Sequence, residues 1–248
     1  MSQYQGTFKR YEKKYLLSEK TYRLLRGRLE DYMVIDHFGK TTICNIYFDT
    51  PNHQLICSSL EKPVYKEKLR LRSYGTPAEG TPVFVELKKK YKGVVYKRRE
   101  KMELTESEHY LYDNLPVPRT SQIVREINWF LNFYKNLRPA MYISYSRIAM
   151  YGSDDPELRI TFDCDILWRE EELYLEAGVW GSPLLEKGQR LMEIKIAGSM
   201  PLWLSRILGE LDIYPVSFSK YGRGYQFAQQ NREKKNEITI RKGEMKYA

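Results

Sequence analysis

Residues 68–75 read Lys-Leu-Arg-Leu-Arg-Ser-Tyr-Gly, with basic and apolar side chains in strict alternation at the start. Alternate residues of a β-strand point to opposite faces, so Lys68, Arg70 and Arg72 share one face and the two leucines between them share the other. The pattern predicts a strand over residues 64–74 with one cationic and one apolar face. The fold must bury the leucines and leave the cations against water or an anion.

The same alternation recurs in other segments rich in Val, Ile, Tyr, Phe and Thr, which favour strands. We expect strands over residues 6–17, 42–48, 64–74, 82–91, 94–104, 140–151, 158–166 and 189–197. We expect helices over residues 19–32 and 121–137, from a capping box at Thr105, and after Ser199. Long antiparallel strands in this number favour one domain with a closed or nearly closed sheet, because closure removes exposed edges.

Charged strand faces are often simply exposed to solvent, and that alternative stays open. Here, however, the charged positions are mostly Arg and Lys, with carboxylates at Glu12, Glu86 and Glu193. Like charges on neighbouring strands destabilise a sheet, unless the charged faces line a wet interior that holds a polyanion. Few carboxylates among many cations also suggest Mg²⁺ or Mn²⁺ bridging to phosphate.

The composition is that of a folded protein with an anionic partner. The chain has 248 residues, 42% of them hydrophobic, and a formal charge of +9, which attracts anions without saying which. Its longest run without Asp, Glu, Lys or Arg covers residues 50–60, far short of the ~20 apolar residues that cross a bilayer. Three cysteines without C-x-x-C spacing, and an N-terminus unlike a signal peptide, favour a cytoplasmic location.

Nine short motifs occur in a fixed order along the chain. They are Glu-Lys-Lys-Tyr at 12–15, Tyr-Phe-Asp-Thr at 47–50, Arg-Leu-Arg-Ser-Tyr-Gly at 70–75, Val-Glu-Leu-Lys at 85–88, Lys-Arg-Arg at 97–99, Tyr-Ser-Arg at 145–147, Leu-Arg-Ile-Thr-Phe-Asp at 158–163, Leu-Met-Glu-Ile-Lys at 191–195 and Phe-Ser-Lys-Tyr at 218–221. Together they resemble the catalytic domain of the vacuolar transporter chaperone (VTC) family. That domain is a polyphosphate polymerase of the triphosphate tunnel metalloenzyme (CYTH-like) superfamily, and the resemblance covers about residues 8–225.

The resemblance implies an α+β fold, an eight-stranded antiparallel β-barrel tunnel with helices packed outside. It implies ATP and pyrophosphate or polyphosphate as substrates and a divalent metal, Mn²⁺ or Mg²⁺, held by Glu193. The implied catalytic phosphate-binding residues are Lys14, Arg70, Arg72, Lys88, Lys97, Arg147, Arg159 and Lys220. Further substrate-binding residues are expected at Arg10, Glu12, Lys68, Arg99 and Lys195. Residues 1–228 would form the tunnel domain and residues 229–248 a basic, flexible tail.

The sequence departs from the wider superfamily at its start. That superfamily begins with a Glu-x-Glu-x-Lys pattern, whereas Arg10 stands here in the first glutamate's place and Glu12 alone remains. Fewer acidic residues suit the polymerase branch better than the hydrolase or cyclase branches. A triphosphatase of the same fold and a non-catalytic polyanion-binding module stay open as alternatives. Nucleic acid is not an expected partner, while the oligomeric state and a separate membrane partner are left open.

Overall fold

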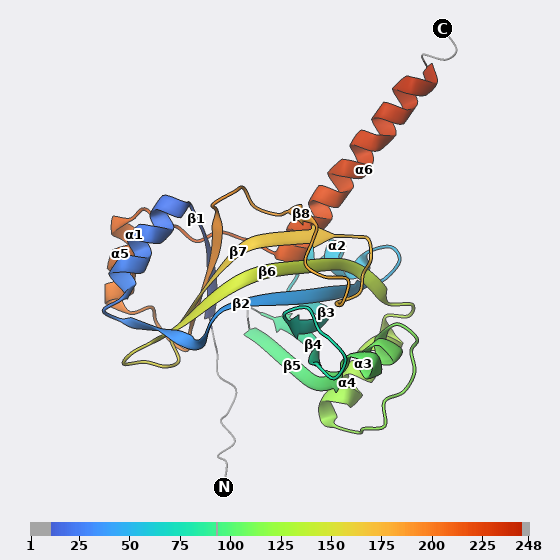
Figure 1. Ribbon diagram of the computed structural model, residues 1–248, viewed down its shortest axis with the longest axis horizontal. Coiled ribbons are helices and arrows are strands. Elements are labelled where there is room, and N and C mark those ends of the chain that lie inside the picture. The colour runs from blue at the N-terminus through green and yellow to red at the C-terminus, as the bar shows by residue number, and fades with distance from the viewer. Residues whose placement is uncertain (1–10, 93, 245–248) are drawn as a thin grey trace.

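An antiparallel sheet forms the body of the protein in the computed structural model, which describes residues 11–92 and 94–244 (Figure 1). The strands are β1 (Tyr11–Leu17), β2 (Met33–Asp49), β3 (Tyr65–Tyr74), β4 (Pro82–Tyr91), β5 (Val94–Glu103), β6 (Arg138–Gly152), β7 (Arg159–Arg169), β8 (Ser182–Pro183) and β9 (Arg190–Ile196). Their order across the sheet is β1-β9-β7-β6-β2-β3-β4-β5, and β8 pairs with β7. The strand positions agree with those expected, except that β2 begins earlier and the first expected strand is described only from Tyr11.

Six helices lie outside this sheet in the described part of the chain. They are α1 (Glu19–Leu29), α2 (Gln54–Leu60), α3 (Leu104–Leu111), α4 (Gln122–Phe133), α5 (Leu202–Glu210) and α6 (Lys220–Glu244). Figure 1 shows α1 and α5 together at one end of the molecule and α3 and α4 at the other. The start of α6 packs against α2 and β6, and its remainder projects away from the sheet. None of the helices described is both long and apolar enough to span a membrane.

The apolar strand faces point outward and are covered by the helices. Leu69 and Leu71 of β3 are fully buried in one core cluster with Ile127 and Phe130 of α4. A second cluster joins the outer faces of β7 and β9 to α1 and α5. The charged faces of these strands therefore line the interior, as the alternation predicted.

The two edge strands, β1 and β5, are not joined by a backbone ladder within the described residues. Lys88 Nζ of β4 instead lies 3.5 Å from Glu12 Oε2 of β1, and Val216 pairs with the backbone of Lys14. The α+β class and the antiparallel sheet with outer helices are confirmed. Among the described residues, side chains and a loop rather than a strand ladder lie along the β1–β5 seam, which is within the closed or nearly closed arrangement expected. The sheet also has nine strands rather than eight, since it includes the two-residue β8.

Some local expectations need correction. Thr105 does not cap a helix, because α3 already begins at Leu104 and its N-cap Glu103 makes no side-chain cap. The segment from residue 229, expected to be flexible, is helical to Glu244 as part of α6. Its Gln, Arg, Glu and Lys residues are good helix formers, which accounts for the continuation. The division of the chain at residue 228 stays a prediction.

Candidate functional site

A buried carboxylate, Glu86, organises the cations of β3 and β5. On the neighbouring strands, Arg70 of β3 and Arg99 of β5 lie directly opposite Glu86. All three side chains therefore face inward. Arg70 Nη2 lies 2.6 Å from Glu86 Oε2, and Lys97 Nζ lies 2.7 Å from Oε1. Burial opposes ionisation of Glu86, but the charges of Arg70, Arg72 and Lys97 outweigh it and hold the pKa of Glu86 far below its usual range.

A second ionic group occupies the wall formed by β6, β7 and β9. Arg147 Nε lies 2.6 Å from Asp163 Oδ1, so a salt bridge to an arginine of the neighbouring strand engages this carboxylate. Lys220, the first residue of α6, reaches Asp163 Oδ2 at 2.5 Å and Glu193 Oε1 at 3.3 Å. Burial lowers the pKa of Lys220, but the two carboxylates raise it above the ordinary lysine value. Lys220 is therefore a fixed positive charge.

Several lysines lie near the seam between β1 and β5. They line a cavity of about 1360 Å³, into which β1, β3 and β4 contribute Lys14, Lys68 and Lys88. Lys68 Nζ donates to Ser219 Oγ at 3.0 Å, a neutral acceptor. Burial, together with the neighbouring charges of Lys14 and Lys66, lowers the pKa of Lys68 to about 7. An anion bound here would relieve that repulsion.

Most of the residues singled out from the sequence come together in this interior. Lys14, Lys68, Arg70, Arg72, Lys88, Lys97, Arg99, Arg147, Lys195 and Lys220 are linked to Glu12, Glu86, Asp163 or Glu193 by ion pairs or electrostatic interactions, or line the cavity. Arg159 lies opposite Lys195 in register, and so on the same face of the sheet, but it is exposed at the first position of β7. Arg10 lies outside the described residues. The roles of all these residues in binding and catalysis remain proposals.

The structure adds three uncharged residues that the search for charges missed. Arg72 Nε donates to Asn45 Oδ1 at 2.8 Å, and Arg72 Nη2 donates to Tyr145 Oη at 3.1 Å. Arg70 Nη1 donates to Tyr47 Oη at 3.1 Å. These contacts fix the two guanidinium planes, which are the groups best shaped to bind phosphate bidentately. Asn45, a polar residue in the otherwise apolar run at 43–48, was the available signal in the sequence.

Oxygen donors suited to a divalent metal lie beside Lys14. Lys14 Nζ is 3.5 Å from Glu12 Oε1 and 3.4 Å from Glu193 Oε1, so one lysine links both carboxylates. Thr161 pairs with Glu193 in register, and its buried hydroxyl has no hydrogen-bond partner among the residues that the structure describes. Within the part of the chain that the structure describes, no group of three acidic, histidine or cysteine side chains could hold a metal. The donors fit a hard cation that takes its remaining ligands from phosphate and water.

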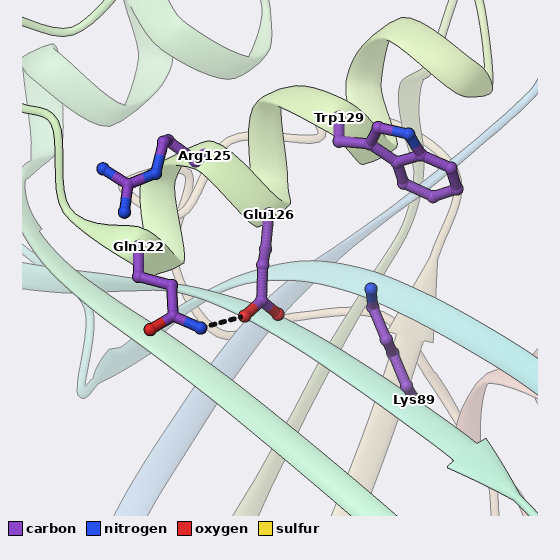
Figure 2. Close-up of a pocket in the computed structure, with 5 residues that line it drawn as sticks. All are labelled: Lys89, Gln122, Arg125, Glu126 and Trp129. Carbon is purple, nitrogen blue, oxygen red and sulfur yellow. Dashed lines mark hydrogen bonds between the residues drawn. The ribbon is translucent and has the colours of Figure 1, made fainter.

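A smaller groove of about 260 Å³ lies on the outer face of the sheet, under α4. Figure 2 shows the side chains that line it. Gln122 is hydrogen-bonded to Glu126, and Trp129 lies above Lys89. Glu126 binds Arg98, and Lys89 lies 3.5 Å from the buried Glu67. Arg125 donates to the carbonyl oxygen of Thr120. The groove is thus lined by two cations, Lys89 and Arg125, whereas many more line the interior cavity.

The fold is similar to that of solved proteins with low sequence identity. One is a candidate adenylate cyclase (bh2851) from Bacillus halodurans, with a TM-score of 0.54 at 16% identity, over 85% of this chain and 95% of that one. Another is HpAC1 from Hippeastrum, a candidate adenylyl cyclase described as having a dominant triphosphatase activity, with a TM-score of 0.54 at 16% identity, over 87% of this chain and 94% of that one. These likenesses show the tunnel fold.

Among curated protein sequences, nothing matches this chain. The VTC domain, by contrast, matches residues 9–229, which is nearly the whole length of the chain and includes every described element of the interior. The chain belongs to the VTC domain family.

Proposed function

We propose that this protein is an ATP-dependent polyphosphate polymerase. It would transfer the terminal phosphate of ATP to the end of an inorganic polyphosphate chain and release ADP. Membership of the VTC domain family supports an enzyme that handles triphosphates, and the motifs within that domain support the polymerase in particular. The observation that carries the proposal is the interior lined by inward-facing cations from β1, β3, β4, β5, β6 and β9.

Phosphoryl transfer requires mainly that the reacting groups be positioned and their charge stabilised, which suits this interior. Arg70 and Arg72, held by Tyr47, Asn45 and Tyr145, would grip phosphate oxygens bidentately. Lysines such as Lys14, Lys88 and Lys97 would act as point charges along the phosphate path. Arg147 and Lys220, fixed by Asp163, would complete the opposite wall.

Glu193 and Glu12 are the residues that would hold the divalent metal. When bound, Mn²⁺ or Mg²⁺ would neutralise charge on the phosphate oxygens. The chain's own part is to keep both carboxylates ionised. At Glu193, burial acts against ionisation, but Lys220, Lys14 and Arg147 together hold its pKa well below the usual range. We also propose a cytoplasmic location, in keeping with three cysteines that are all free. A separate membrane partner for the product would be consistent with the proposal.

A triphosphatase of the same fold is the second candidate, and the triphosphatase activity described for HpAC1 favours it. In that reaction water accepts the phosphate in place of a polyphosphate chain. A polyanion-binding module without catalysis is the third candidate. The ordered ionic groups around Glu86 and Asp163 support an active site over simple binding, since binding alone needs no fixed guanidinium planes.

Incubation of the purified protein with ATP and Mn²⁺ tests the proposal. The products are separated on a gel that stains polyphosphate, and orthophosphate is measured in parallel. We expect a ladder of polymer with ADP and little orthophosphate. Orthophosphate without polymer would establish the triphosphatase instead, and the absence of both products would leave the binding module.

A further inference from the structure

One stripe of α6 leads from the buried ionic group to the mouth of the cavity. Lys220, Arg223 and Phe227 are spaced i, i+3 and i+7, so they share a face of the helix. Lys220 contacts Asp163 in the interior, whereas Arg223 and Phe227 line the cavity. Seven residues of helix span about 10 Å. Lys220 is buried whereas Arg223 is exposed, so the stripe runs from the depth at which phosphate would be held to the solvent-accessible end of the cavity.

The mouth differs from the interior in chemistry. Phe227 contributes an aromatic ring, and Leu60 of α2 contributes an apolar side chain to the same cavity. The guanidinium carbon of Arg223 lies 4.7 Å from the centroid of the Phe227 ring. Arg223 thus lies over one face of the Phe227 ring, and its own guanidinium plane is exposed. A guanidinium plane backed by an aromatic ring is a surface on which a nucleobase can stack, and stacking of this kind accepts any base.

From this arrangement we infer that Phe227 and Arg223 form the nucleoside-binding end of the tunnel. The base of ATP stacks against the Phe227–Arg223 pair while its phosphates extend inward to Lys68 and Arg70. Lys68 lies close to the start of α6, as this placement of the phosphates requires. Its ammonium group contacts Ser219, directly before α6, and lies 5.9 Å from the ring centroid of Tyr221. The inference rests on the proposed function, since it gives the nucleotide a position in the same site.

The test compares two ligands that share a triphosphate but differ in having a base. Binding of ATP and of inorganic tripolyphosphate is measured by calorimetry for the wild-type protein and for Phe227→Ala, Phe227→Leu and Arg223→Ala. We expect Phe227→Ala to weaken ATP binding by roughly 5- to 100-fold and tripolyphosphate binding by less than about twofold. Phe227→Leu keeps an apolar side chain where Phe227 packs against the core, so it separates loss of stacking from loss of folding.

Phe133→Ala is the matched control, because that ring is 61% exposed on α4 and is not among the described residues that line the cavity. It should leave both affinities unchanged. An unaltered ratio of ATP to tripolyphosphate affinity in the Phe227 and Arg223 variants would overturn the inference while leaving the proposed function intact. Failure of the wild-type protein to bind either ligand would overturn both.

Discussion

At the scale of single residues, the alternation of charge and leucine in 68–72 was enough to predict which side chains face inward. Two lysines in this interior have pKa values far below the ordinary lysine value. Burial and neighbouring cations lower the pKa of Lys68 to about 7, and burial, partly offset by Glu86, lowers the pKa of Lys97 to about 7. Both are therefore partly neutral above pH 7, and a bound anion would favour their charged forms.

This protonation predicts a pH dependence for anion binding. Below pH 7 Lys68 is already charged, so binding takes up no proton there. Above pH 7 binding must protonate it, so affinity for tripolyphosphate should fall as pH rises from 6 to 8. Lys68→Arg keeps its charge at every pH and should reduce both the fall in affinity and the proton uptake at pH 8. Calorimetry in buffers of different ionisation enthalpy measures that uptake, and identical uptake in the variant would contradict the assignment.

Glu86 makes a second prediction at this scale. Glu86→Gln removes the partner of buried cations, so we expect the free energy of unfolding to fall by about 3–5 kcal/mol. Tripolyphosphate would replace the lost negative charge and should raise the melting temperature of the variant by more than it raises that of the wild type. Glu126→Gln is the control, because it breaks a more exposed ion pair with Arg98 and should cost less than about 1 kcal/mol. Equal ligand shifts in Glu86→Gln and the wild type would argue against anion binding beside Glu86.

The roles of three uncharged residues, Asn45, Tyr47 and Tyr145, could not be predicted from the sequence. Their inward position follows from strand alternation, but their role depends on which arginines lie opposite them. Tyr47 faces Arg70 only because β2 and β3 adopt the register that pairs these two residues. Register is set by contacts between distant parts of the chain, so no local pattern encodes it.

At the scale of elements, helix starts were predictable where a side chain caps the backbone. Ser121 was expected to begin a helix, and its Oγ accepts a hydrogen bond from Val124 N at 3.1 Å. Thr105 also carries a side-chain hydroxyl and has a Glu three positions later, yet the strand β5 runs directly into α3 and leaves no free N-cap at that position. Whether Thr105 caps a helix was therefore decided by the connection to the preceding strand and not by local composition.

These two residues give a matched pair of variants. Ser121→Ala removes the cap of α4 and should lower the free energy of unfolding by about 1 kcal/mol. Thr105→Ala removes no cap and should change it by less than about 0.5 kcal/mol. Chemical denaturation of both variants measures the difference. Equal losses would mean that the hydrogen bond at Ser121 contributes nothing to α4.

At the scale of the whole molecule, the sequence predicted an inside-out sheet but not how its edges meet. The eight longer strands and their outward apolar faces follow from alternation and from the helices available to cover them, whereas the two-residue β8 does not. Closure depends on which residues face each other across the seam, here Glu12 and Lys88. The sequence also did not predict that α6 projects away from the sheet. The part of α6 from residue 229 onward has no apolar face from which packing could be predicted.

The central claim of this account is that the inward-facing cations bind a triphosphate. Its most direct test is the affinity of tripolyphosphate for the wild-type protein, for Arg70→Ala in the interior and for Arg125→Ala in the outer groove under α4. Loss of charge-assisted hydrogen bonds should weaken binding by about tenfold or more in Arg70→Ala, whereas Arg125→Ala should bind as the wild type does. Equal losses in the two variants would contradict a defined interior site and would leave only general attraction between a basic surface and an anion.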